Sequence, residues 1–146
     1  MAALTGLVVV AISINLTRIL SIAQLPRRAG ESLFLLVGAI VLASVALVPN
    51  QPGTLLGVEI AAVGLVMLAA PLAIQISSRN LDAAVSPAKR SARAAVTVAA
   101  GAPFLIAGVL LYGGSNAGLY WAAAGVIISL VGGVWNTWIL LVEILR

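Results

Sequence analysis

Five long apolar segments dominate this sequence, and they constrain its fold more than any other feature. The segments cover residues 4–23, 27–48, 55–76, 94–112 and 119–145. A helix of about 20 apolar residues crosses the hydrocarbon core of a bilayer, which is about 30 Å thick. No other open structure satisfies the backbone polar groups of such a segment in lipid. The sequence therefore predicts an all-α integral membrane bundle of five transmembrane helices.

Short turns and one polar connection separate these segments. Residues 49–53 and 113–118 are rich in proline and glycine, which mark tight turns. Residues 77–93 form the one polar connection of any length, a predicted cytoplasmic loop, and residues 80–86 within it are either loop or a short interfacial helix that ends at Pro87. Because the five segments use nearly the whole chain, we expect residues 1–146 to form a single transmembrane domain.

The basic residues orient this predicted bundle in its membrane. All eight lie on one side of it, and they are Arg18, Arg27, Arg28, Arg79, Lys89, Arg90, Arg93 and Arg146. Lysine and arginine next to short loops are retained in the cytoplasm. Aromatic residues favour interfaces, and the predicted fifth helix carries Tyr120 and Trp121 at its outer end, with Trp135 and Trp138 toward its inner end. The pattern predicts an outside N-terminus and a cytoplasmic C-terminus.

Composition excludes many chemistries. The chain has no cysteine and no histidine, so it lacks thiol ligands, disulfides and the commonest metal ligand and general base. Its four acidic residues are Glu31, Glu59, Asp82 and Glu143, and the predicted map puts Glu59 across the membrane from the other three. We therefore expect no enzyme, no catalytic residues, no cofactor and no metal site. Membrane insertion accounts for the net charge of +4, so we expect membrane lipids and not nucleic acid as partners.

Glu59 is the first candidate functional residue. It lies about one turn into the third segment from the outer side, and its side chain carries the only charge on the outer half of the map. An ionisable group inside a membrane needs a partner, a route to water or a function. Glu59 therefore either becomes protonated, lines a wet vestibule that binds cations or protons, or reaches the outer headgroups.

Two further pairs of polar residues lie toward the inner face. Asn15 and Arg18 are three residues apart and share one face of the first segment. Arg18 either attracts anions, forms an ion-pair lock or extends to the cytoplasmic surface. Asn136 and Glu143 are seven residues apart and project from one face of the fifth segment. Glu143 either pairs with an inner arginine or forms part of a polar gate. We predict that Asn15, Arg18, Asn136 and Glu143 form one polar cluster near the inner face.

A stripe of small residues marks a close helix contact in the fifth segment. Gly125, Ser129, Gly133 and Thr137 recur every four residues, and small residues at this spacing let transmembrane helices approach closely. The partner is either the first segment of the same chain or a second copy. Because five spans with small faces bury little on their own, we expect a homo-oligomer.

Three stretches carry a resemblance to other proteins. They are W-N-T-W-I-L-L-V-E-I-L-R at 135–146, I-S-I-N-L-T-R-I-L at 12–20 and L-P-R-R-A-G-E at 25–31. Together they resemble a group of short bacterial membrane proteins with five hydrophobic spans. The resemblance implies a multi-pass protein of the bacterial inner (plasma) membrane and transfers no function.

Two hypotheses about function follow from these features. The first is an oligomeric membrane channel or small transporter for ions or small solutes, in which water between the helices explains the ionisable residues inside the membrane. The second is a non-catalytic accessory subunit of a larger inner-membrane complex, which docks through its small-residue helix faces. A channel conducts when purified alone, whereas a subunit stays silent and co-purifies with its complex.

Overall fold

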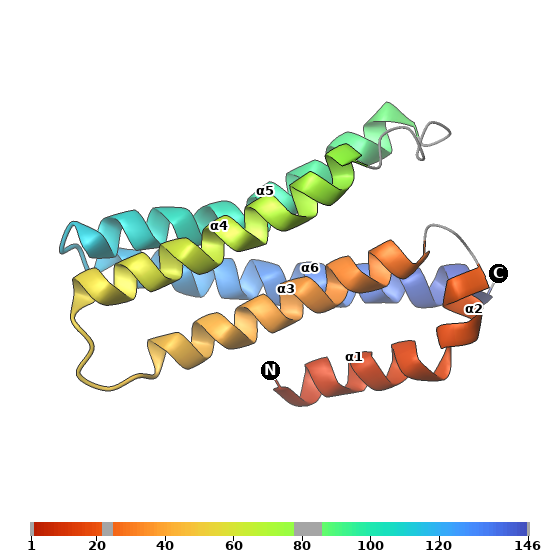
Figure 1. Cartoon of the computed structure of the whole chain (residues 1–146), viewed down its shortest axis with the longest axis horizontal. Helices are drawn as coiled ribbons and strands as arrows, with labels where there is room; N and C mark the ends of the chain where they lie inside the picture. The colour runs from red at the N-terminus through yellow and green to blue at the C-terminus, as the bar shows by residue number, and fades with distance from the viewer. Residues whose placement is uncertain (1, 22–24, 78–85, 146) are drawn as a thin grey trace.

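The computed structural model describes residues 2–21, 25–77 and 86–145, without the side chains of residues 28, 89 and 143–145. Over these residues every regular element is a helix, which confirms the all-α part of the predicted fold class. The helices are α1 (Ala2–Ile14), α2 (Leu16–Ser21), α3 (Leu25–Ala46), α4 (Gly53–Ser77), α5 (Pro87–Tyr112) and α6 (Ala117–Leu145). The four longer helices run along the same axis, and the short α1 lies beside α3 (Figure 1).

Four of the described helices are long and apolar enough to cross a membrane. Their apolar stretches are Leu25–Ala46, Gly53–Ser77, Arg90–Tyr112 and Ala117–Val142. Each contains at least 22 residues, more than the roughly 20 that a bilayer core requires. These helices indicate a multi-pass membrane protein, and they agree closely with the second to fifth predicted segments.

The first predicted span, residues 4–23, is not a single helix. It divides at Asn15 into α1, with 13 residues, and α2, with 6. The Asn15 side chain donates a hydrogen bond of 2.9 Å to the Ala11 carbonyl, a local bond of the kind that competes with helical pairing. At 1.5 Å per residue α1 is about 20 Å long, and its start reaches only about the middle of the bundle (Figure 1). Five spans are therefore not confirmed.

The fifth helix in the chain, α5, starts earlier than predicted. It begins at Pro87, within the predicted loop 77–93, so that Arg90 and Arg93 belong to its first two turns. Proline is favoured at the first position of a helix because it has no backbone N–H to leave unpaired there. The short helix predicted for 80–86 falls almost entirely on residues 78–85, which lie outside the described residues, as do Arg79 and Asp82.

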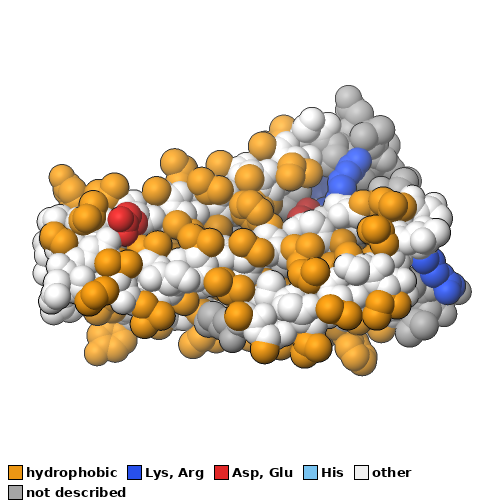
Figure 2. All heavy atoms as spheres, turned by 60° about the horizontal axis from the view of Figure 1, so that its bottom comes forward, with side chains coloured by type: hydrophobic (Ala, Val, Ile, Leu, Met, Phe, Trp, Pro, Cys, Tyr) orange, Lys and Arg blue, Asp and Glu red, His pale blue; other side chains and the backbone are white. Residues whose placement is uncertain are grey.

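The bundle has two chemically different ends. One end, which we call the turn end, holds the connections 47–52 and 113–116 together with Glu59. The opposite end, which we call the basic end, holds Arg18 and the first turns of α3 and α5. Basic side chains gather there in Figure 2, whereas hydrophobic side chains cover most of the length between the two ends.

Glycines bring α4 and α5 into close contact toward the turn end. A Cβ atom added to Gly108 would lie 2.6 Å from both the Gly57 carbonyl oxygen and the Ala61 Cβ atom. A Cβ atom added to Gly57 would lie 2.6 Å from the backbone nitrogen of Tyr112. We call this contact the glycine seam. Because backbone meets backbone there, the seam admits no larger side chain without separating the two helices.

The main apolar core fills the space between α3, α4, α5 and α6. Phe104 is fully buried at its centre, and its ring occupies the space that a Cβ atom of Gly125 would need. Leu42, Ile60 and Met67 are buried in the same cluster. A second cluster, which includes Val8, Ile12, Ile19, Leu36 and Leu140, attaches α1 and α2 to α3 and α6.

Toward the basic end the bundle opens. The α4–α5 pair bends away from the α3–α6 pair, so that the two pairs diverge (Figure 1). The structure therefore combines a filled turn end with an open basic end, and Glu31, Arg90 and Arg93 lie where the helices separate.

Candidate functional site

One face of α5 changes from polar to apolar along its length. Arg90, Arg93 and Thr97 follow one another at spacings of three and four residues, which places them on one side of the helix. The same spacing continues through the buried Ala100 and Phe104. The inward face of α5 is therefore charged at the basic end and merges into the core.

Two cavities lie against this polar face. The α4–α5 cavity, of about 540 Å³, is lined by Leu72, Gln75, Ile76, Pro87, Arg90, Ser91, Arg93 and Ala94. The α5–α6 cavity, of about 570 Å³, includes among its lining residues Glu31, Pro71, Arg93, Thr97, Trp135 and Asn136. Arg93 lines both, so its side chain stands at their junction.

An ion pair occupies this junction. The Nη2 atom of Arg93 donates to the Oε1 atom of Glu31 on α3 at 2.6 Å. The side chains are 26% and 14% exposed, so water screens the pair less than it screens a surface pair. The contact joins α5 to α3 across the opening between the two helix pairs.

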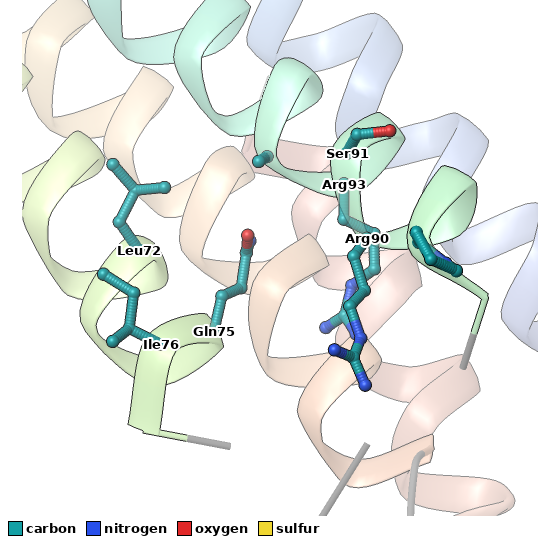
Figure 3. A pocket seen from close by; sticks show the side chains of 8 residues that line it. Leu72, Gln75, Ile76, Arg90, Ser91 and Arg93 are labelled. Carbon is teal, nitrogen blue, oxygen red and sulfur yellow. The ribbon is translucent and has the colours of Figure 1, made fainter. Parts of the chain in front are cut away.

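Neutral polar groups continue the site. Gln75 of α4 donates through Nε2 to the Thr97 hydroxyl at 3.0 Å, and this hydroxyl donates to the Arg93 carbonyl at 3.2 Å. In Figure 3 the Arg90 and Arg93 side chains extend in the same direction, while Gln75 lies on the α4 side of the cavity. The site thus offers guanidinium and amide donors beside a single described carboxylate.

The predicted inner cluster is not seen as one group among the described side chains. Asn136 lines the α5–α6 cavity, but the Asn15 side chain bonds to the Ala11 carbonyl of α1, and Arg18 is exposed on α2. The Glu143 side chain lies outside the described residues. The structure instead brings Asn136 to the cavity that holds Glu31 and Arg93.

Glu59 lies far from this site, at the turn end. Its carboxylate is half-buried and accepts a hydrogen bond from the side-chain amide of Gln51, which belongs to the turn before α4. The contact attaches the turn to the first turns of α4. A neutral amide therefore stands beside Glu59, where the sequence offered no nearby basic residue.

The small-residue stripe of α6 packs inside the chain. Gly125 faces Phe104 of α5, and a Cβ atom added to Gly133 would lie 2.9 Å from Leu36 Cγ of α3. Ser129 is fully buried, and the Thr137 hydroxyl donates to the Gly133 carbonyl at 2.8 Å. The stripe thus meets α3 and α5, which leaves the predicted homo-oligomer without support from these residues.

Sequence reasoning did not select Glu31, Gln75, Arg93 or Thr97 as a site. Glu31 and Arg93 are 62 residues apart, and Arg93 fell in the predicted loop. A usable signal was present, because a helix that starts at Pro87 places Arg90, Arg93 and Thr97 on one face. Comparison with protein-family models, with curated proteins and with solved structures finds no match for the chain.

Proposed function

We propose that this protein is a small membrane transport protein for ions or small solutes. The observation that carries the proposal is the Arg93–Glu31 ion pair inside apolar helices, where Arg93 lines both the α4–α5 cavity and the α5–α6 cavity. Charged groups at membrane depth are rare, and they mark routes for ions or solutes when they face a cavity. A purely structural bundle has no need of a charged cavity there.

The filled turn end favours a transporter over a permanently open pore. Phe104, Ile60 and Met67 are each at most 2% exposed and fill the path beyond the cavities. A cavity that is open at one end and closed by packed side chains at the other is typical of one state of an alternating-access cycle. In this proposal the turn end opens when the basic end closes.

The orientation proposed for this transporter follows the charges. Basic residues near short loops remain in the cytoplasm, so the basic end faces the cytoplasm and the turn end faces outward. Together with the resemblance noted above, this points to the inner membrane of a bacterium. Both cavities lie within one chain, so the route does not require a second copy.

The cysteine-free sequence provides a direct test. Thr97→Cys places a thiol at the α5–α6 cavity, and Val98→Cys places one at the same depth on an exposed apolar position outside the residues that line either cavity. We expect a charged, membrane-impermeant thiol reagent applied from the basic side to modify the Thr97→Cys variant and to leave the Val98→Cys variant unmodified.

Flux measurements complete this test. Purified protein in liposomes is given potassium, chloride and phosphate gradients before and after thiol modification. We expect selective flux that modification of the Thr97→Cys variant blocks. Correctly inserted protein that passes none of these ions, and whose Thr97→Cys variant resists the reagent, contradicts the proposal.

An accessory subunit is the second candidate, and one observation favours it. The short α1 covers α6 incompletely, leaving an apolar groove lined by Leu4, Leu130, Val131, Val134, Trp135 and Trp138. Continuous apolar contact with a larger membrane protein is one way to fill such a groove. If the protein is an accessory subunit, we expect no ion flux from the liposomes. We also expect the protein to co-purify with a membrane complex at a fixed stoichiometry after mild solubilisation.

A further inference from the structure

The junction of the two cavities already holds an oxyanion group, which the chain supplies itself. The Glu31 carboxylate accepts a hydrogen bond of 2.6 Å from Arg93 at the point where the cavities meet. A guanidinium presents planar donors that match carboxylate and phosphate groups, and arginine is preferred over lysine where that geometry matters. The ion pair therefore shows which chemistry this position recognises.

Two guanidinium groups line the cavities. They belong to Arg90 and Arg93, and the Glu31 carboxylate lines the α5–α6 cavity beside Arg93. Arg90 precedes Arg93 by one turn and extends in the same direction (Figure 3). Because water and ions screen charges weakly in a partly enclosed cavity, a guanidinium group there attracts an anion more strongly than it would on an open surface.

The cavities also have the size and the neutral donors that a small ligand needs. Volumes of about 540 and 570 Å³ lie within the roughly 300–1,000 Å³ range of small-molecule sites. The amides of Gln75 and Asn136 and the hydroxyls of Ser91 and Thr97 line them. Such groups orient a ligand whose charged end is held by arginine.

We propose that the junction binds a small oxyanion, with a carboxylate or phosphate group taking the place of Glu31 on Arg93. This assignment rests on the proposed transport function and names its class of substrate. Entry of the anion exchanges an internal ion pair for an external one, so Arg93 keeps a partner while α5 is released from α3. Binding is thereby linked to the contact that joins the two helix pairs.

Inorganic phosphate is the probe. Its affinity is measured by calorimetry on the full-length protein in nanodiscs of phosphatidylcholine, which has no net charge, against chloride at equal ionic strength. We expect phosphate to bind and chloride not to compete. Arg93→Gln should weaken phosphate binding at least about tenfold, because a hydrogen bond to a charged group is lost. Glu31→Gln should strengthen binding, because the internal competitor loses its charge.

Arg18→Gln is the matched control. It removes the same charge at the same end of the bundle, from a residue outside the lining of either cavity. We expect it to change phosphate affinity by less than about threefold, since the interactions of exposed and distant charges are screened. Arg93→Lys retains the charge without the planar donors and should bind phosphate with intermediate affinity. Thermal unfolding of each variant establishes that it is folded.

A second set of nanodiscs separates two sources of the anion. If phosphatidylglycerol in the disc competes with phosphate in the wild type but not in Arg93→Gln, the oxyanion at the junction is a lipid headgroup. If it does not compete, the oxyanion is a free solute. Both results support an oxyanion site at Arg93.

The contrary results are distinct from failure of the transport proposal. Folded wild-type protein that binds no phosphate, or an Arg18→Gln variant that loses as much affinity as Arg93→Gln, overturns the oxyanion assignment. If the Thr97→Cys variant still reacts with the aqueous reagent and flux persists, the transport proposal stands alone. If the thiol is also unreactive and flux is absent, both proposals fail.

Discussion

The turn end and the basic end of this bundle are held together by different interactions. At the turn end α4 meets α5 through glycines, and Phe104, Ile60 and Met67 fill the space behind them. At the basic end the helix pairs separate, an ion pair joins α3 to α5 across the opening, and a side-chain hydrogen bond joins α4 to α5. Close packing cannot rearrange without large cost, whereas an ion pair can exchange partners. The contacts at the basic end therefore rearrange at a smaller cost than those at the turn end.

The largest effect is expected from breaking the glycine seam. Gly108→Leu places a branched side chain where even a Cβ atom would lie 2.6 Å from the Gly57 carbonyl oxygen. Overpacking of this kind costs about 3 kcal/mol, because α4 and α5 must separate. The free energy of unfolding, measured by denaturant titration in mixed micelles, should fall by about that amount.

A glycine outside the seam provides the control for this prediction. A Cβ atom added to Gly132 of α6 would lie 3.8 Å from its nearest neighbours, Leu35 Cδ1 and Val96 Cγ1, which is ordinary contact. Gly132→Ala should change the free energy of unfolding by less than about 0.5 kcal/mol. Equal losses in the two variants would show that the seam has no special part in stability.

The second effect concerns the ion pair at the basic end. Glu31→Gln leaves the Arg93 guanidinium without the carboxylate that it contacts at 2.6 Å. Loss of a hydrogen bond between charged groups costs about 1–3 kcal/mol. We expect the free energy of unfolding to fall by this smaller amount, and spin labels introduced by Gly30→Cys and Ala88→Cys to report a wider distance between α3 and α5.

A second pair of labels restricts this change to one end. Ala46→Cys on α3 and Val109→Cys on α5 place spin labels on exposed positions at the turn end. Their distance distribution should be the same with and without Glu31→Gln. Widening at both ends would show that the ion pair does not act on the basic end alone.

The smallest effect should come from the neutral polar contact. Thr97→Val keeps the shape of the side chain and removes the hydroxyl that accepts from Gln75 and donates to the Arg93 carbonyl. Hydrogen bonds between transmembrane helices contribute about 0.6 kcal/mol on average. The control is Ser44→Ala, which removes a hydroxyl that bonds within its own helix, to the Ile40 carbonyl. If Thr97→Val lowers the free energy of unfolding by no more than Ser44→Ala does, the Gln75–Thr97 hydrogen bond does not stabilise the basic end.

Much of the fold follows from hydropathy alone. The predicted segments 27–48, 55–76 and 119–145 differ from α3, α4 and α6 by at most two residues at either end. Lipid allows an apolar segment of this length few alternatives to a helix, so composition determines the structure there. The break at Asn15 was not predicted because it depends on one hydrogen bond, from the Asn15 side chain to the Ala11 carbonyl. A mean hydropathy taken over many residues does not detect such a contact.

The site was less accessible to sequence reasoning. Asn136 was selected from its position in an apolar segment and does line a cavity, whereas the partners Glu31 and Arg93 come from helices that pack together only in three dimensions. From charge alone, several acidic residues were possible ion-pair partners of Arg93. The spacing of Arg90, Arg93 and Thr97 becomes informative once α5 is known to begin at Pro87, because that start converts a charged loop into a helix face.

The glycine seam also has a mechanical consequence. Because α4 and α5 are joined backbone to backbone beside the turn end, a rotation of one about that contact would carry the other with it. At 1.5 Å per residue the part of α4 from Gly57 to Ser77 is about 30 Å long, so a rotation of about 10° would displace its far end by about 5 Å. Small differences in packing at the glycine seam would therefore cause larger displacements at the far end of α4. The glycines of the seam, which contact no solute, thus limit how wide the basic end can open.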